Sequence, residues 1–386
     1  MEEHTLREVE LITGMKRGTV PFTYLGVIVS PKRLYVQDCQ CLIDRVVDRI
    51  RGMGSRKFSY AGRVVLIKAV LSTLHGYWAR IFILPKMVIS KIEAICRGYL
   101  WHGADQRESP ALVSWANICQ PRKQGGLGLK DFHVWNLATV GKYAWWVANK
   151  EDHLWVRWVH AVYIKSSSWW EYIPGSGCSW AWRKICQVKQ LLKPYLSNLS
   201  SEEHYTITAG YQWLKPEIGQ VSWYPWMLNQ WLIPKQQFIV WLVAQRRLLT
   251  QDRLLRMGII QGNSCFLCGM QEESVDHLFF ECPFSRHCRD LISDWCKVSL
   301  PLHNCISWWI ELRRHFACGK KVIAIILSSL VYHVWQCRNI CRVDECVVRP
   351  CIVLARVQCH VKMRLGQCTI RSKNALALAW VEYLKA

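Results

Sequence analysis

Residues 264–282 read SCFLCGMQEESVDHLFFEC and place Cys265, Cys268, His277 and Cys282 at the spacing Cys-x2-Cys-x8-His-x4-Cys. Two cysteines separated by two residues can bind one Zn²⁺ from a tight turn. A histidine followed by a cysteine after a short interval can supply the other two ligands of a tetrahedral zinc site. Gly269, directly after the second cysteine, supplies the backbone freedom that such a turn needs. The pattern favours a small domain folded around one zinc ion.

Such a site would be closed, because three thiolates and one imidazole fill all four tetrahedral positions and leave none for a catalytic water. Metal here would therefore serve folding rather than chemistry. The alternative is a set of ordinary buried cysteines with a satisfied histidine, since a chance Cys-x-x-Cys is a hazard in a chain with 19 cysteines. The order of the set and the apolar segment after His277 favour zinc. His287 is a second candidate for the imidazole ligand.

The composition is globular and strongly basic. With 386 residues, 51% of them hydrophobic, the chain is long enough for two or three domains, and it is neither disordered nor membranous in character. Its formal net charge is +22, from 50 Lys and Arg against 28 Asp and Glu. That excess favours a polyanionic partner, most simply nucleic acid, because phosphate contacts release counterions. A generic basic protein without such a partner is the alternative.

The sequence also indicates a compartment. The first ten residues, MEEHTLREVE, are acidic and lack the apolar core of a secretory signal. The longest apolar run, residues 322–335, is short and interrupted by Ser328, Ser329 and His333, so we expect no membrane partner. Cysteines in a chain without an export signal are expected to be thiols or metal ligands in a reducing compartment. We therefore expect a nuclear or cytoplasmic protein.

The pattern of apolar residues predicts a mainly α fold. Residues 20–30 are typical of a short strand, and residues 38–51 carry apolar side chains at helical spacing. Further helices are expected over 60–74 and 88–100, two more between 133 and 164, and a helical tail after residue 308 that Pro350 breaks. Residues 165–180 collect Ser, Gly and Pro and predict a linker.

Basic residues recur around these helices. Gly125, Gly126 and Gly128 form a glycine-rich turn next to two of them, where backbone amides could approach a phosphate. A plain turn is the alternative, and the sequence does not match a Walker loop, so no small-molecule substrate is expected. For the arginines, the alternative to contact with nucleic acid is that their side chains are simply solvated. The residues predicted to contact nucleic acid are Arg56, Lys57, Arg63, Lys68, Arg122, Lys123, Arg246, Arg247 and Arg253.

Several blocks together resemble the back half of the reverse transcriptases of plant non-LTR (LINE-type) retrotransposons. The blocks run in the family's order and cover nearly the whole chain. They are PFTYLGVIVS, DCQCLIDRVVDRIRG, FSYAGRVVLIKAVLSTL, YWARIFILPKMVISKIEAICRGYLW and PRKQGGLGLKD, then WLIPKQQFIVWLVAQRRLLTQDRLLRMGI, CFLC and EESVDHLFFECPFSR.

The resemblance implies roles for particular residues. Tyr24, Leu25 and Gly26 match a strand motif that helps to hold the primer end in that family. Cys265, Cys268, His277 and Cys282 match its zinc-ligand positions. The implied domains are a palm-edge strand over 1–30, a helical thumb or connector over 31–165, a linker and variable region over 166–203, a zinc-binding domain over 204–298 and a helical C-terminal region over 299–386. The implied partner is RNA or an RNA–DNA hybrid.

One departure from the family bears on activity. Its polymerase holds two metal ions on a Tyr-x-Asp-Asp hairpin, and this sequence contains no Asp-Asp pair. We therefore expect no polymerase activity from this chain alone. Two alternatives stay open: an inert remnant of a degraded element, and part of an intact RNA-directed DNA polymerase cut short by the gene model.

Overall fold

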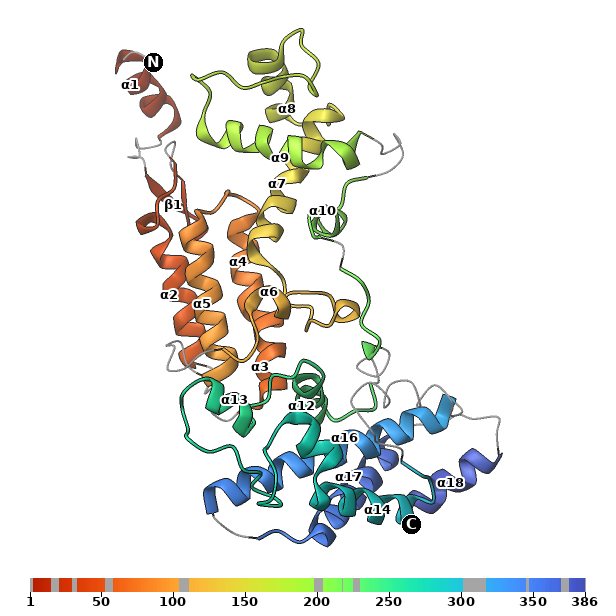
Figure 1. Ribbon diagram of the computed structural model, residues 1–386. Helices are drawn as coiled ribbons and strands as arrows, with labels where there is room; N and C mark the ends of the chain where they lie inside the picture. The colour runs from red at the N-terminus through yellow and green to blue at the C-terminus, as the bar shows by residue number, and fades with distance from the viewer. Residues whose placement is uncertain are drawn as a thin grey trace.

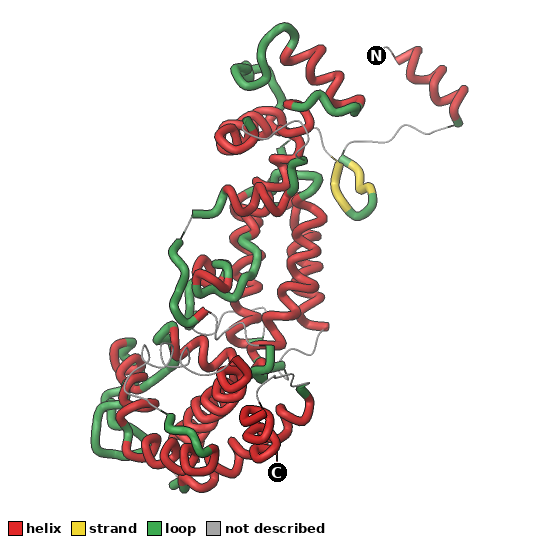
Figure 2. The backbone as a smooth tube through the Cα atoms, turned by 90° about the vertical axis from the view of Figure 1, so that its right-hand side faces the viewer, coloured by secondary structure: helices red, strands yellow, loops and turns green. Residues whose placement is uncertain are grey.

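The computed structural model describes residues 3–14, 21–29, 33–52, 58–103, 111–197, 204–216, 218–224, 230–300, 317–344, 347–368 and 375–385. The described part is an elongated assembly of helices, which confirms the predicted mainly α fold (Figures 1 and 2). The helices α2, α4 and α5 lie side by side in the middle, α8 and α9 lie at one end, and α12 to α18 lie at the other (Figure 1).

The N-terminal part holds helix α1 (Glu3–Thr13) and a two-stranded hairpin of β1 (Phe22–Tyr24) and β2 (Val27–Val29). The strands are antiparallel, with Phe22 opposite Val29. Leu25 and Gly26 form the turn and both have positive φ, at 49° and 77°, as a type I′ turn requires. The sequence predicts a single short strand over 20–30 here. The structure corrects this, because the chain reverses at Leu25 and the two halves pair with each other.

The next helices form the middle of the molecule. They are the 3-10 turn η1 (Gln37–Cys39), α2 (Gln40–Gly52), α3 (Tyr60–Leu66), the π-helical segment η3 (Ile67–Leu71), α4 (Ser72–Ala79) and α5 (Lys86–His102). Ser59 starts α3 by accepting a hydrogen bond from the amide of Gly62 at 3.3 Å. The helices predicted over 38–51, 60–74 and 88–100 are confirmed, although the second runs through the π-helical segment to residue 79.

A long helix joins the middle to the upper end. After α6 (Trp115–Ile118) and the 3-10 turn η4 (Arg122–Gln124), α7 (Phe132–Ala148) begins at Asp131, whose carboxylate accepts from the amide of Val134 at 3.0 Å. Phe132 belongs to the main hydrophobic core, whereas Val140 and Val147 belong to a second core. Helix α7 therefore connects two separately packed parts.

The second core corrects the predicted linker over 166–203. It is formed by the end of α7 with α8 (Leu154–Val159), the π-helical segment η5 (His160–Ile164), α9 (Trp180–Leu196) and α10 (Ile207–Trp213). Helix α9 lies inside the predicted linker and packs on α7, with Val188 and Leu192 buried. The Ser- and Gly-rich run ends at Ser179, which caps the helix by accepting from the amide of Trp182.

The lower end carries the cysteine-rich segment and the C-terminal helices. They are α12 (Pro234–Ala244), α13 (Gln251–Arg256), the π-helical turn η6 (His277–Glu281), α14 (Pro283–Cys296), α16 (Ala317–Asp344), α17 (Pro350–Gln367) and α18 (Ala375–Lys385). Pro350 begins α17, in the first turn where a missing amide costs nothing. The tail is therefore helical on both sides of Pro350.

The middle and the lower end share one continuous hydrophobic core. Helix α12 packs on α3, and the rings of Tyr60 and Phe238 stack with centroids 5.0 Å apart and planes 16° apart. The core runs from Val27 in β2 to Leu384 in α18. Within the described ranges, no helix is long and apolar enough to cross a bilayer.

Candidate metal centre

The four predicted ligands come together at one point. One side-chain atom from each of Cys265, Cys268, His277 and Cys282 lies within 4.8 Å of the other three. The sulfurs of Cys265 and Cys282 are 4.0 Å apart, and Nε2 of His277 is 3.4 Å from the sulfur of Cys268. Zn–S bonds of about 2.3 Å and Zn–N bonds of about 2.0 Å at tetrahedral angles imply S···S and S···N edges of roughly 3.8 and 3.5 Å. The donor set therefore fits Zn²⁺.

A short turn positions the first two cysteines. Gly269 closes it by donating its amide to the carbonyl of Cys265 at 2.7 Å, with φ at 68°, a left-handed conformation that favours glycine. The amide of Cys265 donates to the carbonyl of Gln271 at 2.8 Å, so the chain folds back on itself. Both cysteines thus project from one loop held by backbone bonds.

A π-helical turn positions the other two ligands. In η6 the amide of Cys282 donates to the carbonyl of His277 at 2.7 Å, five residues back. This wider turn carries Leu278, Phe279 and Phe280 into the core and leaves His277 and Cys282 at its two ends. Pro283 then begins α14. Single π-turns of this kind are frequent at functional sites.

The surroundings suit a neutral imidazole, and the sulfurs meet opposing influences. The contact with Cys282 and burial raise the pKa of Cys265, and backbone amides directed at its sulfur act against that rise. N–H groups directed at a sulfur stabilise its thiolate form, which is the form that binds metal. Burial lowers the pKa of His277, which keeps its ring neutral. Backbone amides donate to two of the sulfurs: those of Leu267 and Cys268 to Cys265, and those of Phe284 and Ser285 to Cys282.

His287 lies apart from this group. It is exposed on α14 and is not among the four side chains that converge. We therefore expect His277→Ala to weaken zinc binding by more than the roughly 10- to 100-fold typical of losing a group that only supports a ligand. His287→Ala should leave zinc affinity unchanged. Competition for zinc against a chelating dye measures both variants, and equal losses would contradict the assignment of His277.

A buried ion pair that the sequence did not reveal ties this segment to α16. Glu273, in the loop between the cysteine turn and η6, is fully buried and accepts from Arg338 at 2.6, 2.9 and 3.1 Å. Glu273 also accepts from the amide of Gln251 at 3.0 Å. The guanidinium of Arg338 lies between the rings of Phe266 and Trp335, with centroids 5.2 and 5.0 Å away. Among the described residues, the carboxylate of Glu273 and the guanidinium of Arg338 therefore both have hydrogen-bond partners.

The glycine-rich turn serves structure rather than phosphate binding. Its amides are used within the turn: those of Gly125, Gly126 and Gly128 donate to the carbonyls of Arg122, Pro121 and Gln120. A Cβ at Gly126 would meet the carbonyl oxygen of Gln120 at 2.0 Å, so only glycine fits. The carbonyl of Gly125 accepts from Trp241 Nε1 and Gln245 Nε2, both at 2.8 Å, which fastens the turn to α12. The plain-turn interpretation is the one that fits.

The predicted nucleic-acid contacts fall into three groups. Arg56 and Lys57 lie outside the described residues. Arg63, Arg246 and Arg253 bond to groups within the protein. Their partners are Leu100 O for Arg63 at 3.2 Å, Asp276 for Arg246 at 2.8 Å, and the carbonyls of Leu112 and Arg247 for Arg253. Arg122, Lys123 and Arg247 are exposed.

Lys68 is half-buried and lies beside Arg122, a member of the exposed group. Its ammonium donates to the carbonyl of Leu127 at 2.6 Å, and both its Nζ and Cγ of Arg122 lie within 4 Å of a Cβ built at Gly128. Burial and the charge of Arg122 lower the pKa of Lys68 to about 8. Two like charges thus meet at one turn, an arrangement that an anion would stabilise.

Comparison with known proteins supports this assignment. Residues 205–288 match the family described as zinc-binding in reverse transcriptase. The chain is 30% identical to a putative ribonuclease H protein of Arabidopsis thaliana over 161 residues, which are 41% of this chain and 26% of that protein. It is 27% identical to an uncharacterized mitochondrial protein of Arabidopsis thaliana over 112 residues, 29% of this chain and 73% of that one. The chain thus spans about a quarter of the first relative. The resemblance to sequences of reverse-transcriptase type is confirmed.

Proposed function

We propose that this chain binds RNA or an RNA–DNA hybrid, mainly through phosphates, and that Zn²⁺ at Cys265, Cys268, His277 and Cys282 holds its reverse-transcriptase zinc-binding domain folded. The metal serves structure, because four protein ligands leave no position for water or substrate. When bound, it supplies cross-linking between the cysteine turn and the π-helical turn. Catalysis is not part of the proposal, since the sequence contains no Asp-Asp pair to hold polymerase metals.

The observation that carries the proposal is convergence of positive charge at the turn around Gly128. The net charge is +22, and Lys68 and Arg122 meet at one turn with Lys123 exposed beside them. A second group of arginines lies before the zinc segment, where burial and then the charges of Arg247 and Arg256 lower the pKa of Arg253. Asp252, paired with Arg256 at 2.8 Å, offsets part of that charge. Like charges brought together destabilise a fold, and a polyanion offsets that cost.

Salt dependence tests the proposal. We expect the affinity for a labelled RNA–DNA hybrid to fall by at least about tenfold between 50 and 200 mM salt, because phosphate contacts release counterions. Arg122→Ala should weaken binding and make the slope of log affinity against log salt shallower by about one unit. Fluorescence anisotropy measures both.

Arg183→Ala is the matched control, because Arg183 is exposed on α9 in the second core and its loss removes the same charge. It should leave the slope closer to that of the unaltered chain than Arg122→Ala does. Affinity that does not change between the two salt concentrations would refute the proposal.

A further inference from the structure

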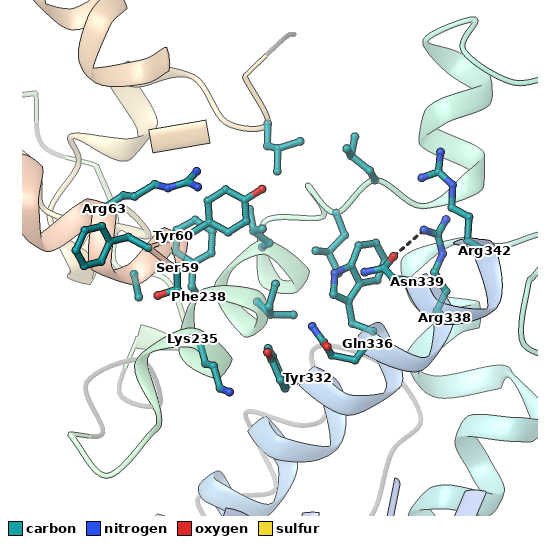
Figure 3. A pocket seen from close by; sticks show the side chains of 18 residues that line it. Ser59, Tyr60, Arg63, Lys235, Phe238, Tyr332, Gln336, Arg338, Asn339 and Arg342 are labelled. Atoms are coloured by element: carbon teal, nitrogen blue, oxygen red, sulfur yellow. Dashed lines mark hydrogen bonds between the residues drawn. The ribbon is translucent and has the colours of Figure 1, made fainter. Parts of the chain in front are cut away.

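A cavity of about 520 Å³ opens between α3, α12 and α16, at the junction of the middle helices and the lower end. Figure 3 shows Tyr60, Arg63 and Phe238 on one side, Gln336, Arg338 and Arg342 on the other, and Lys235 from α12 below Phe238. Three segments far apart in the sequence therefore build one hollow. Its volume falls within the range of about 300–1,000 Å³ that small organic groups occupy in proteins.

The walls of the cavity are aromatic. Phe58, Tyr60, Phe238, Tyr332 and Trp335 line it. Phe58 is 43% exposed, whereas Tyr60 and Phe238 stack on each other deeper inside. Flat apolar walls of this kind suit the face of a nucleobase, and stacking on aromatic side chains is how unpaired bases are commonly held.

The rim of the cavity is cationic. Lys235 and Arg342 are exposed, and Arg63 lies at the wall with its guanidinium over the ring of Tyr60 at 5.3 Å. No carboxylate is among the described residues that line the cavity, and the charge of Arg338 is balanced by Glu273 behind it. The opening therefore suits a ligand in which an anionic group is attached to a flat ring.

Two side-chain amides lie in the same wall. Gln336 and Asn339 both line the cavity, and they can donate to and accept from the edge of a base. Asn339 is held by a hydrogen bond from Arg338 to its side-chain oxygen at 3.0 Å, which leaves its NH₂ group as a donor (Figure 3).

We propose that this cavity takes an unpaired nucleotide of a single-stranded RNA or DNA segment, with its base against the aromatic walls and its phosphate at Lys235 and Arg342. The inference rests on the proposed function and deepens it, because it adds recognition of a base to contacts with phosphates. An acidic peptide would satisfy the cationic rim but would leave the aromatic walls unused.

The test compares two strands of equal charge. A fluorescein-labelled ten-residue oligouridine and an abasic strand with the same number of phosphates are titrated with the full chain in zinc-containing buffer. Phe58→Ala should weaken binding of oligouridine by at least about fivefold, because one stacked base is lost, and should leave the abasic strand unaffected. Lys235→Ala with Arg342→Ala should weaken both strands.

The matched control for the double variant is Arg183→Ala with Lys193→Ala, two exposed cations on α9. A second readout does not depend on affinity: 5-iodouridine in the strand should photocrosslink to residues that line the cavity, and Phe58→Ala should reduce that crosslink.

The outcomes separate the two proposals. If the unaltered chain binds neither the hybrid nor oligouridine, the proposed function fails. If it binds both with steep salt dependence, but Phe58→Ala affects the two strands equally or crosslinks fall outside the residues that line the cavity, only the cavity inference is overturned. Polyglutamate could also displace oligouridine. If it did, and if Phe58→Ala weakened binding of polyglutamate and oligouridine to the same extent, the cavity would be assigned to an acidic peptide instead.

Discussion

Cys265→Ser is expected to abolish stoichiometric zinc binding and to unfold the segment around residues 235–295. Cys265 is 1% exposed and its sulfur lies 4.0 Å from that of Cys282, so serine removes a ligand in a place where water cannot replace it. Structural zinc contributes about 10–16 kcal/mol in isolated zinc-finger peptides, whereas whole domains are stable by only about 5–15 kcal/mol. The loss should therefore exceed what this segment can tolerate.

Hydrogen exchange locates the effect. The amides of Cys265, Gly269 and Cys282 all donate to carbonyls within the segment, so they should lose protection in Cys265→Ser and in the unaltered chain treated with a chelator. Amides of α9 and of the C-terminal half of α7 should keep theirs, because those residues pack in a separate core. Metal analysis should find about one zinc per unaltered chain.

Cys359→Ser is the control, because Cys359 is an exposed thiol on α17 outside the converging group. It should retain zinc and protection. A folded preparation that contains no zinc, or a segment that stays protected after chelation, would show that the four side chains gather without needing a metal.

The ligands could be found from the sequence because they lie within one short stretch. Cysteine and histidine at this spacing are typical of zinc sites, and local turns suffice to bring them together. The helices of the middle part were predictable for a similar reason, since the apolar spacing of Leu42, Val46 and Ile50 is itself a consequence of the helix they form. Both signals are local.

Features that depend on distant contacts were not predictable in the same way. The run of Ser and Gly before Trp180 suggested a linker, although Ile185, Val188 and Leu192 follow it at helical spacing. The internal bonds of Arg63 depend on where α5 ends. Exposed and buried arginines look alike in a sequence, so only the fold separates them.

The ion pair of Glu273 and Arg338 is the largest feature missed. The two residues lie 65 positions apart, and the sequence around each one does not indicate the other as its partner. One signal was present: Arg338 continues the apolar stripe of Leu330 and Val334 along α16, where a charge is out of place. A cation within an apolar stripe indicates a buried partner.

Glu273→Gln is expected to destabilise the lower end by about 3–5 kcal/mol, because it leaves the charge of Arg338 buried and uncompensated. The side chains of Arg338 and Glu273 are only 1% and 0% exposed, so solvent cannot take over. Glutamine keeps the shape of the side chain and an oxygen that can accept from Gln251, so the loss reports charge rather than packing. Chemical denaturation, with unfolding monitored by hydrogen exchange in α14 and α16, measures this loss of stability.

Asp152→Asn supplies the comparison, since Asp152 and Arg157 form a pair whose side chains are 82% and 71% exposed. Pairs in water contribute about 0–1 kcal/mol, so this variant should be close to neutral. If Glu273→Gln were equally mild, Arg338 would have to reach solvent through a rearrangement of α16, and the buried pair would not be the fastening between α16 and the cysteine-rich segment.

A double variant distinguishes the attraction of the pair from the cost of an unpaired charge. Glu273→Gln combined with Arg338→Met removes both charges and keeps an unbranched apolar stem between Phe266 and Trp335. Removing both charges of a buried ion pair leaves no uncompensated charge, whereas removing one partner does. The double variant should therefore recover most of the stability that Glu273→Gln loses. Because Arg338 also lines the cavity, its oligouridine affinity should be compared with that of the unaltered chain, which would show whether the balanced charge contributes to binding.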